Sequence, residues 1–511
     1  MTDTQAGAGE KQRGFPSPFT NLILVTILVW IAVLFIPSGQ YQLDADGNPI
    51  AGSFEQIESP LDFGERVAEL LLAPVNGLYG IQDPETGQVG PFNRGSLFGA
   101  AQVFAFILAI GGFMTVVFAT GALELGISHL AHRFRARGTV LIVALSLLFG
   151  LLGSVMSWSD ETLGFYALML PLMLSLGYDR MVLVAVVTVA PFVGVIGSTI
   201  NPFTMGVASD AAGVSIGDGL GWRLLLFVLA MGAMIFYTVR YANRVQADPA
   251  SSIVGIDPAD AELARHADQD ELEPLSTRHK VIIALVVFTF LLLTFSIVPW
   301  GAILYNTAAD PVTHETIVDP FPWELGWWLP ELSVMFLVMA VVVGAVGRLG
   351  EAGTARAFMR GVADFVGPAV LVVLARGVSV IMNNTKTIDT VLNAMEGLVE
   401  GTSNVVFILL MYLVNLPLAF LIGSPSGNAV LTMPILAPLA DFSGVDRSLV
   451  ITAWNGAGRW FALVLPTNGI LLAGLGLAQV GYDKHLRFLL PLWGILLAFI
   501  LVILVIAALV Q

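Results

Sequence analysis

Long apolar stretches separated by short polar segments make up most of this chain from residue 21 onward. A helix needs about 20 apolar residues, at about 1.5 Å each, to cross the hydrocarbon core of a bilayer. Nine stretches approach or exceed this length, and each predicts a full membrane span. They are Asn21–Pro37, Leu97–Leu123, Met181–Ile200, Gly221–Ala242, Val281–Pro299, Leu329–Gly347, Phe365–Met382, Leu449–Leu472 and Phe488–Val510.

Two further apolar stretches, Thr139–Leu176 and Asn404–Phe442, are interrupted in the middle by polar and small residues. The interruptions are Ser154–Glu161 and Gly423–Asn428. Backbone leaves helical geometry at membrane depth only where protein or water satisfies its hydrogen bonds, so such breaks normally line a cavity. We therefore expect two re-entrant hairpins. The alternative is one ordinary span plus a surface helix in each stretch.

The distribution of Lys and Arg favours the hairpins. With two hairpins, most basic residues between spans fall on one side, as is typical of the cytoplasmic side. A full span at Thr139–Leu176 would instead move the segment from Arg240 to Lys280 to the other side. We therefore expect a multi-pass protein of the cell inner membrane with a cytoplasmic N-terminus and an outside C-terminus.

The expected organisation follows from these spans. It comprises a cytoplasmic tail (1–20), a first repeat (21–242) with hairpin 139–176, a cytoplasmic linker (243–280), an extra span with an outside loop (281–328), and a second repeat (329–511) with hairpin 404–442.

Composition supports this class of protein and excludes others. Hydrophobic residues make up 56% of the chain and charged residues 12%, whereas soluble domains carry about 25% charged residues. The net charge of −15 excludes a basic nucleic-acid footprint, so no nucleic-acid partner is expected. With no Cys, the chain has no thiolate metal site and no cysteine nucleophile. No phosphate-binding loop of the Walker kind is present, and we expect no cofactor beyond Na⁺ or H⁺ as coupling ion.

The two hairpin regions repeat each other at a shift of 267 residues, which aligns Ser157–Asn201 with Ser424–Asn468. Identical residues fall at the hairpin tips, at the hairpin exits and in the helix that follows. Because the two hairpins enter from opposite sides, the repeats have opposite orientation. This is the plan of inverted-repeat secondary transporters, so we expect an all-α polytopic fold with about nine spans and two re-entrant hairpins.

Each hairpin is followed by a helix that Gly, Pro and polar residues break, at Gly197–Phe203 and Leu465–Gly469. Such breaks free backbone carbonyls, and hard cations such as Na⁺ prefer oxygen ligands. We expect two related pockets for Na⁺ and substrate, one from Ser157, Ser159, Ser198, Thr199 and Asn201, the other from Ser424, Ser426, Asn428, Thr467 and Asn468. The alternative is that these residues only join the broken helices. Proton coupling stays open because Asp160 and Glu161 lie at a hairpin tip.

Two arginines fall in the middle of predicted spans, Arg376 and Arg459. Arginine within a membrane is costly and is therefore a functional candidate. One hypothesis is that Arg459, beside the second hairpin, binds a substrate carboxylate in a bidentate fork, with Arg376 as a second candidate. The alternative is a structural ion pair with an acidic side chain, for which the sequence offers Asp160, Glu161 or Asp389.

Several of these motifs resemble the YfcC family. They are Asn201-Pro-Phe203, Ala375-Arg-Gly377 and the segment from Gly423 to Pro434. That family belongs with the DcuC-type C4-dicarboxylate carriers and the arginine/ornithine exchangers of the ion-transporter superfamily, and is similar in plan to AbgT and divalent-anion/sodium symporters. The resemblance implies cation-coupled, elevator-type transport of a small carboxylate by a homodimer with scaffold and transport domains.

The superfamily carries Ser-Asn-Thr sodium motifs at the hairpin tip and broken helix. This chain has Ser-Trp-Ser and Ser-Pro-Ser at the tips, followed by Ser-Thr-Ile-Asn and Pro-Thr-Asn. The resemblance therefore implies a sodium role for Ser157, Ser426, Thr199, Asn201, Thr467 and Asn468.

The sequence thus predicts a secondary active transporter of a C4-dicarboxylate or related organic anion, coupled to Na⁺ or H⁺. An amino-acid exchanger of the arginine/ornithine type is the alternative, with Asp160, Glu161 or Asp389 contacting the substrate amino group. An anion channel would use the same arginines, but the inverted symmetry favours alternating access. We do not expect an enzyme, because no His lies in a predicted hairpin or broken helix to activate a serine.

Overall fold

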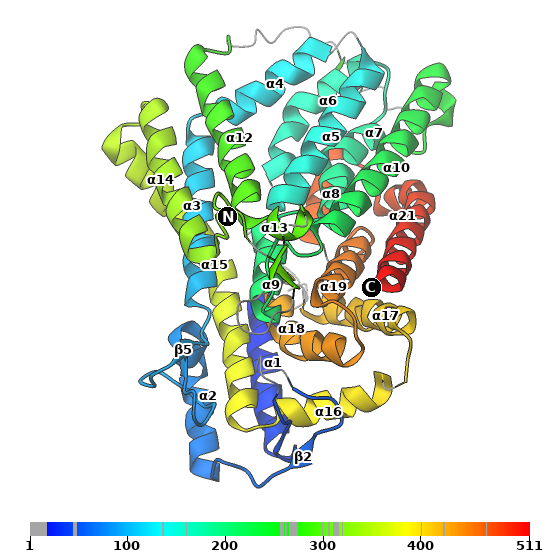
Figure 1. Ribbon diagram of the computed structural model, residues 1–511. Coiled ribbons are helices and arrows are strands. Elements are labelled where there is room, and N and C mark those ends of the chain that lie inside the picture. The colour runs from blue at the N-terminus through cyan, green and yellow to red at the C-terminus, as the bar shows by residue number, and fades with distance from the viewer. Residues whose placement is uncertain are drawn as a thin grey trace, which may run out of the picture.

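The computed structural model describes residues 18–43, 49–134, 137–159, 161–255, 260, 263–264, 274–298, 300–304, 307–309, 316–318, 320–399, 401–422, 425–466 and 468–511. Within these ranges the chain is predominantly helical (Figure 1). Seven of the described helices are long and apolar enough to cross a membrane. The predicted class, an all-α polytopic membrane protein, is confirmed.

The first half of the chain, up to the linker, is built from helices joined by short loops. The helices are α1 (Pro18–Val33), α2 (Phe63–Tyr79), α3 (Ala101–Ala119), α4 (Ala122–Phe134), α5 (Gly138–Met156), the 3₁₀ turn η1 (Glu161–Phe165), α6 (Tyr166–Ser175), α7 (Arg180–Val184), the π-turn η2 (Ala185–Val189), α8 (Ala190–Ile196), the π-turn η3 (Pro202–Gly206), α9 (Val207–Ala212) and α10 (Leu220–Ala247).

The second half continues in the same manner. Its helices are the 3₁₀ turn η4 (Pro249–Ser251), α12 (Thr277–Ile297), α13 (Trp300–Ile303), α14 (Leu329–Val346), α15 (Gly350–Asn384), α16 (Ile388–Val399), α17 (Asn404–Ile422), α18 (Pro425–Phe442), α19 (Arg447–Ala462), α20 (Gly469–Ala478) and α21 (Tyr482–Val510).

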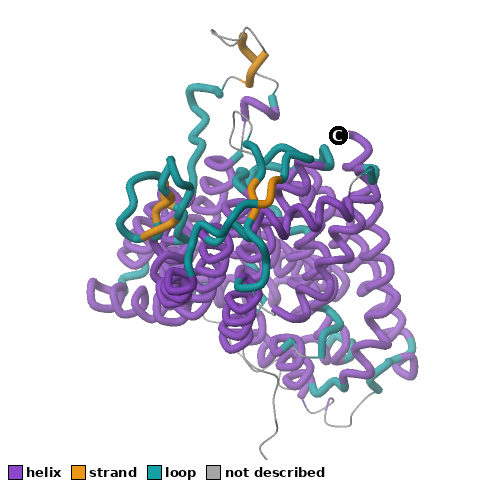
Figure 2. The backbone as a smooth tube through the Cα atoms, turned by 90° about the horizontal axis from the view of Figure 1, so that it is seen from below, coloured by secondary structure: helices purple, strands orange, loops and turns teal. Residues whose placement is uncertain are grey.

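Short antiparallel strands lie in the loops. Figure 2 looks onto the face where these loops lie across helix ends. β1 (Gly39–Gln40) pairs with β2 (Glu55–Gln56), with Gly39 opposite Gln56. The other pairs are β3 (Ile81–Gln82) with both β4 (Val89–Gly90) and β5 (Ser96–Leu97), and β6 (Thr307–Ala309) with β7 (Thr316–Val318).

Both predicted hairpins break where the sequence indicates. α5 ends at Met156 and α6 begins after η1, whereas α17 ends at Ile422 and α18 begins at Pro425. In Figure 1, α5 and α6 lie in the upper half with α4 above them, and α17 and α18 lie in the lower half near α16. The two hairpins therefore approach the centre from opposite ends of the helix bundle, as an inverted repeat requires.

Several predicted spans have different bounds in the structure, and two of them show why. The stretch predicted as Phe365–Met382 belongs to α15, which begins fifteen residues earlier at Gly350 and has 35 residues. The first turns of α15 contain charged side chains such as Arg356 and Arg360, so they lack the apolar pattern that predicts a span. Charged side chains do not interrupt a helix, and α15 therefore begins before the apolar stretch. The stretch predicted as Leu97–Leu123 ends earlier, because Gly121 adopts a positive φ of 68° and separates α3 from α4.

Glycines bring the first hairpin against the broken helix that follows it. A Cβ on Gly194 of α8 would overlap the backbone of Gly150 in α5, and a Cβ on Gly153 would overlap the backbone of Pro191. Small residues at such crossings allow two membrane helices to approach backbone to backbone. The polar residues one turn further along both helices are therefore brought together.

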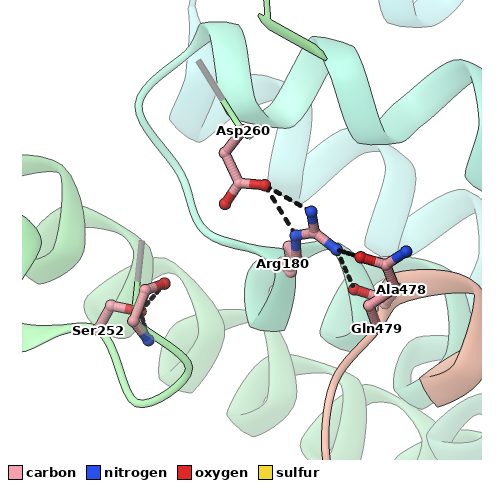
Figure 3. Close-up of polar contacts among 6 residues, drawn as sticks. Arg180, Ser252, Asp260, Ala478 and Gln479 are labelled. Carbon is pink, nitrogen blue, oxygen red and sulfur yellow. Dashed lines mark hydrogen bonds and ion pairs between the residues drawn. The ribbon is translucent and has the colours of Figure 1, made fainter. Parts of the chain in front are cut away.

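The first part of the linker packs onto the helices. Tyr241 of α10 and Ser252 each donate a hydrogen bond to the carboxylate of Asp179. Asp260 accepts hydrogen bonds from Nε and Nη2 of Arg180, at 2.9 and 2.7 Å (Figure 3). The same guanidinium donates to the backbone oxygen of Ala478 and to Oε1 of Gln479. Arg180 therefore joins the start of α7 to the end of α20, and Asp260 of the linker supplies its acidic partner.

Candidate functional site

A cavity of about 1050 Å³ lies where the tips of the two hairpins meet. Its walls come from the first hairpin tip, the start of α18, α19, the segment before α20, and parts of α3, α8 and α15. Six of the residues that the sequence singled out line this cavity. They are Ser157, Ser159, Ser426, Asn428, Arg459 and Asn468.

Four residues of the first predicted pocket form hydrogen bonds with one another or with neighbouring residues. Ser157 ends α5 in the left-handed conformation, with φ 55°, and its Oγ accepts a 2.6 Å hydrogen bond from Nδ2 of Asn201. The backbone N–H of Thr199 donates to Oγ of Ser154 at 3.1 Å. Ser198 donates to the backbone of Val195 at 2.8 Å. These bonds are the ones expected if the residues join the broken helices, and the Na⁺ assignment stays a prediction.

The second predicted pocket is described only in part, because Ser424 and Thr467 lie outside the described residues. Asn468 is the N-cap of α20: its Oδ1 accepts from the N–H of Leu471, and its Nδ2 donates to the oxygen of Ala462 at 3.0 Å. Asn201, its partner in the repeat, is likewise an N-cap and precedes η3. The repeat predicted from sequence therefore holds in the hydrogen bonds of both broken helices.

Arg459 projects from α19 into the wall of the cavity. No described residue forms a hydrogen bond or ion pair with its guanidinium. A guanidinium carries five N–H donors and stays charged at any physiological pH. An arginine in this position, with its donors free of described partners, offers a binding site for an anion.

Two neighbouring residues of α19 connect it to both repeats. Nε1 of Trp454 donates to Oδ1 of Asn428 on α18 at 3.3 Å. Nδ2 of Asn455 donates to the backbone oxygens of Val195 and Ile196, at 2.9 and 3.0 Å. These oxygens lie at the end of α8, just before the helix break. α19, which carries Arg459, is thus fixed against both repeats.

Arg376 lies outside the cavity wall and forms an ion pair. Its Nη2 lies 2.9 Å from Oδ2 of Asp210 in α9, and its guanidinium lies over the ring of Phe98. Asp389 was one of the acidic partners expected from the sequence, and the structure corrects this. Asp389 accepts a hydrogen bond from the backbone of Tyr41 instead. Asp210 was missed because nothing in its sequence position indicates that α9 lies beside α15.

Two acidic residues, Asp160 and Glu161, belong to the first hairpin tip. Asp160 lies outside the described residues. Glu161 begins η1, and the structure describes its backbone but not its side chain. Their predicted roles in proton coupling or amino-group binding stay predictions.

Sequence reasoning also missed several cavity residues, namely Trp158, Asp364, Trp454 and Asn455. Asp364 is an exposed carboxylate on α15 that lies in the cavity wall. The one signal for Asn455 was a polar side chain within the apolar stretch that also contains Arg459. Tryptophans in such stretches look like packing residues, so no sequence pattern distinguished Trp158 and Trp454 as cavity residues.

Comparison with known proteins gives the family. Residues 15–511 match the family described as "DcuC: C4-dicarboxylate anaerobic carrier". The chain belongs to the DcuC family. An Escherichia coli protein named "Putative basic amino acid antiporter YfcC" is 30% identical over 94% of both chains. An uncharacterized protein of Haemophilus influenzae is 29% identical over 96% of both chains.

Two solved transporter structures share the fold. The Alcanivorax borkumensis YdaH transporter, described as having an unusual topology, aligns with a TM-score of 0.65 at 15% identity, over 96% of this chain and 98% of YdaH. Neisseria gonorrhoeae MtrF, described with a class of antimetabolite efflux pumps, aligns with a TM-score of 0.61 at 16% identity, over 96% of this chain and 95% of MtrF. The family match and the apolar helices identify the chain as a multi-pass membrane transporter, and the two structures show its fold.

Proposed function

We propose that this protein is a secondary active transporter that moves a small carboxylate across the cytoplasmic membrane, coupled to Na⁺ or H⁺. The observation that carries the proposal is Arg459, a cation without a described partner in a cavity between two opposed hairpin tips. A carboxylate fits a guanidinium through two parallel hydrogen bonds. The hydroxyls of Ser159 and Ser426 and the amide of Asn428 lie in the same wall.

The mechanism follows from the arrangement of the hairpins. Both tips contribute to one cavity, and they reach it from opposite ends of the bundle. Movement of the hairpin-bearing helices relative to the others would expose the same site first to one side and then to the other, which is alternating access of the elevator type. We further propose a homodimer, with the N-terminus inside and the C-terminus outside as the basic residues favour.

Uptake of labelled succinate into proteoliposomes tests this function. An inward Na⁺ gradient is compared with K⁺ at equal pH, and a pH gradient is tested separately. We expect accumulation driven by one of the two gradients. The variant Arg459→Ala should abolish uptake, and Arg459→Lys should lower it at least about tenfold, because lysine keeps the charge but lacks the planar fork. Arg356→Ala, on the exposed start of α15, is the matched control. Uptake at the wild-type level in both Arg459 variants would refute its role.

Exchange of a basic amino acid is a second candidate function. Two observations favour it: the name of the Escherichia coli relative, and the carboxylate of Asp364 in the same cavity wall. Arg459 would still bind the α-carboxylate, while Asp364 would attract the cationic side chain. Counterflow into vesicles loaded with arginine or ornithine distinguishes the two functions. Asp364→Asn should impair arginine exchange while leaving succinate uptake unaffected.

A further inference from the structure

A second hollow, of about 580 Å³, lies between α10 and α21 and is separate from the central cavity. One face of α10, from Val228 to Arg240, forms one wall, and Ile495 and Phe499 of α21 form the other. The hollow is open beside Gly232, where an added Cβ would meet no atom within 4 Å. It is therefore a lengthwise groove between two membrane-spanning helices.

The groove is apolar along its length and cationic at one end. Tyr237 has a polar group, but its hydroxyl already donates to the backbone oxygen of Phe488 at 2.7 Å. Arg240 is exposed and forms no hydrogen bond or ion pair with any residue that the structure describes. A ligand for this groove thus needs a long apolar part and an anionic group at the Arg240 end.

The length of the groove matches one leaflet of a bilayer. Val228 and Arg240 are twelve residues apart, which is about 18 Å along a helix axis. Half of a typical hydrocarbon core is about 15 Å. With Val228 near the midplane, Arg240 lies at the depth of the lipid phosphates. Arg240 begins the segment up to Lys280 that the distribution of basic residues places on the cytoplasmic side, so the proposed orientation puts Arg240 at the cytoplasmic leaflet.

We propose that this groove binds an anionic phospholipid of the cytoplasmic leaflet, with an acyl chain beside Gly232 and the phosphate at Arg240. The charge argues against a second copy of this chain as the occupant. A symmetric contact through this face would bury Arg240 against apolar side chains, and an unpaired buried charge is strongly unfavourable. An anionic phospholipid avoids this cost, because its phosphate pairs with the guanidinium of Arg240 while its acyl chain fills the groove.

The position of the groove connects the lipid to the transport helices. α10 packs against α5 and α8, and α21 packs against α17 and α19. These helices carry the first hairpin, the broken helix and Arg459. A lipid held between α10 and α21 therefore contacts the outer surface of the body that surrounds the cavity.

Native mass spectrometry of the purified full chain, titrated with phosphatidylglycerol or phosphatidylcholine, tests the proposal. The wild type should prefer phosphatidylglycerol. Arg240→Gln should lower the phosphatidylglycerol affinity about fivefold, the effect of one arginine near a charged surface, and should lower the phosphatidylcholine affinity less, because choline offsets the charge of that lipid's phosphate. Gly232→Leu should lower the affinity for both lipids, because the leucine occupies the groove. Arg356→Gln is the control for loss of a basic residue elsewhere.

Two results would overturn the proposal. One is an Arg240→Gln variant that keeps the wild-type preference for phosphatidylglycerol, or a Gly232→Leu variant that binds both lipids as before. The other is a disulfide between two chains that carry Phe236→Cys, which would show that a second copy covers the groove. The natural chain contains no Cys, so such a cross-link reports on this position alone.

Discussion

The hydrogen bond from Trp454 to Asn428 sets which end of the Asn428 amide is available to a ligand. An indole N–H only donates, so the amide oxygen must face Trp454. The amide N–H₂ group only donates, and it has no partner among the described residues. Together with the guanidinium of Arg459, it makes this wall of the cavity rich in donors, as a carboxylate requires.

A single substitution tests this orientation. Trp454→Phe removes the indole N–H and keeps an aromatic ring, so the Asn428 amide is free to rotate. We expect KM for the carboxylate to rise about threefold to tenfold, the range of one hydrogen bond, with little change in kcat.

Trp158 offers a matched control in the same cavity wall, because its Nε1 is buried without a partner among the described atoms. Trp158→Phe should leave KM unchanged. Equal effects of the two tryptophan variants on KM would contradict the role of Trp454.

The sequence predicted much at the residue scale, but it did not predict partners. Arg459 and Asn428, which the sequence singled out for their polar side chains within apolar stretches, both line the cavity, and their role in substrate binding stays a prediction. The partner of Arg376 was predicted wrongly. Asp210 lies 166 residues away, and an ion pair at that separation depends on how α9 and α15 pack.

At the scale of elements, the inverted repeat places two arginines in related positions. Asp179 and Asp446 are the N-caps of α7 and α19, and Arg180 and Arg447 follow them. Arg180 donates to the oxygen of Ala478, the last residue of α20. Arg447 donates to the oxygen of Ala212, the last residue of α9. An arginine of each repeat therefore binds the C-terminal end of the helix that follows the break in the other repeat.

The two arginines differ in their acidic partner. Arg447 pairs with Asp441 of its own hairpin, whereas the aligned residue in the first repeat is Leu174. Arg180 instead pairs with Asp260 of the linker (Figure 3). The linker supplies the carboxylate that the first repeat lacks.

Burial predicts which of these pairs stabilises the protein more. The side chains of Arg180 and Asp260 are 9% and 10% exposed, against 21% and 30% for Arg447 and Asp441. Asp260→Asn should lower the free energy of unfolding by about 3 kcal/mol, because it leaves a buried guanidinium without its charge partner. Asp441→Asn should cost less than about 1 kcal/mol. Denaturant unfolding in detergent measures both, and a larger loss for Asp441→Asn would refute this account.

At the scale of the whole molecule, one cavity is shared by two hairpin tips that are distant in sequence. Because the natural chain has no Cys, single cysteines at Ser159 and Ser426 report on each tip separately. A transported carboxylate at ten times its Kd should slow thiol labelling at both positions about tenfold, because it occupies most of the sites. Phe92→Cys, in a loop where Phe92 is 94% exposed, should show no protection. Protection at only one tip would contradict a shared site.

The sequence by itself determined the membrane class, the break in each hairpin and the repeat that relates them. These features are local: apolar length sets a span, and glycine, proline and serine at fixed positions interrupt a helix. The family and the fold class predicted from these motifs are both confirmed. The predicted start of α15 was less accurate, because its charged first turns are helical although they lack the apolar pattern.

Only the tertiary structure decided which polar groups meet. It paired Arg376 with Asp210 and gave Arg180 its partner in the linker, and it left Arg459 in the cavity without a described partner. The physical reason is that a hydrogen bond or ion pair depends on distances of about 3 Å between side chains. Those distances are fixed by how helices far apart in sequence pack, as at the contact of Gly150 with Gly194, and not by the pattern of any one segment.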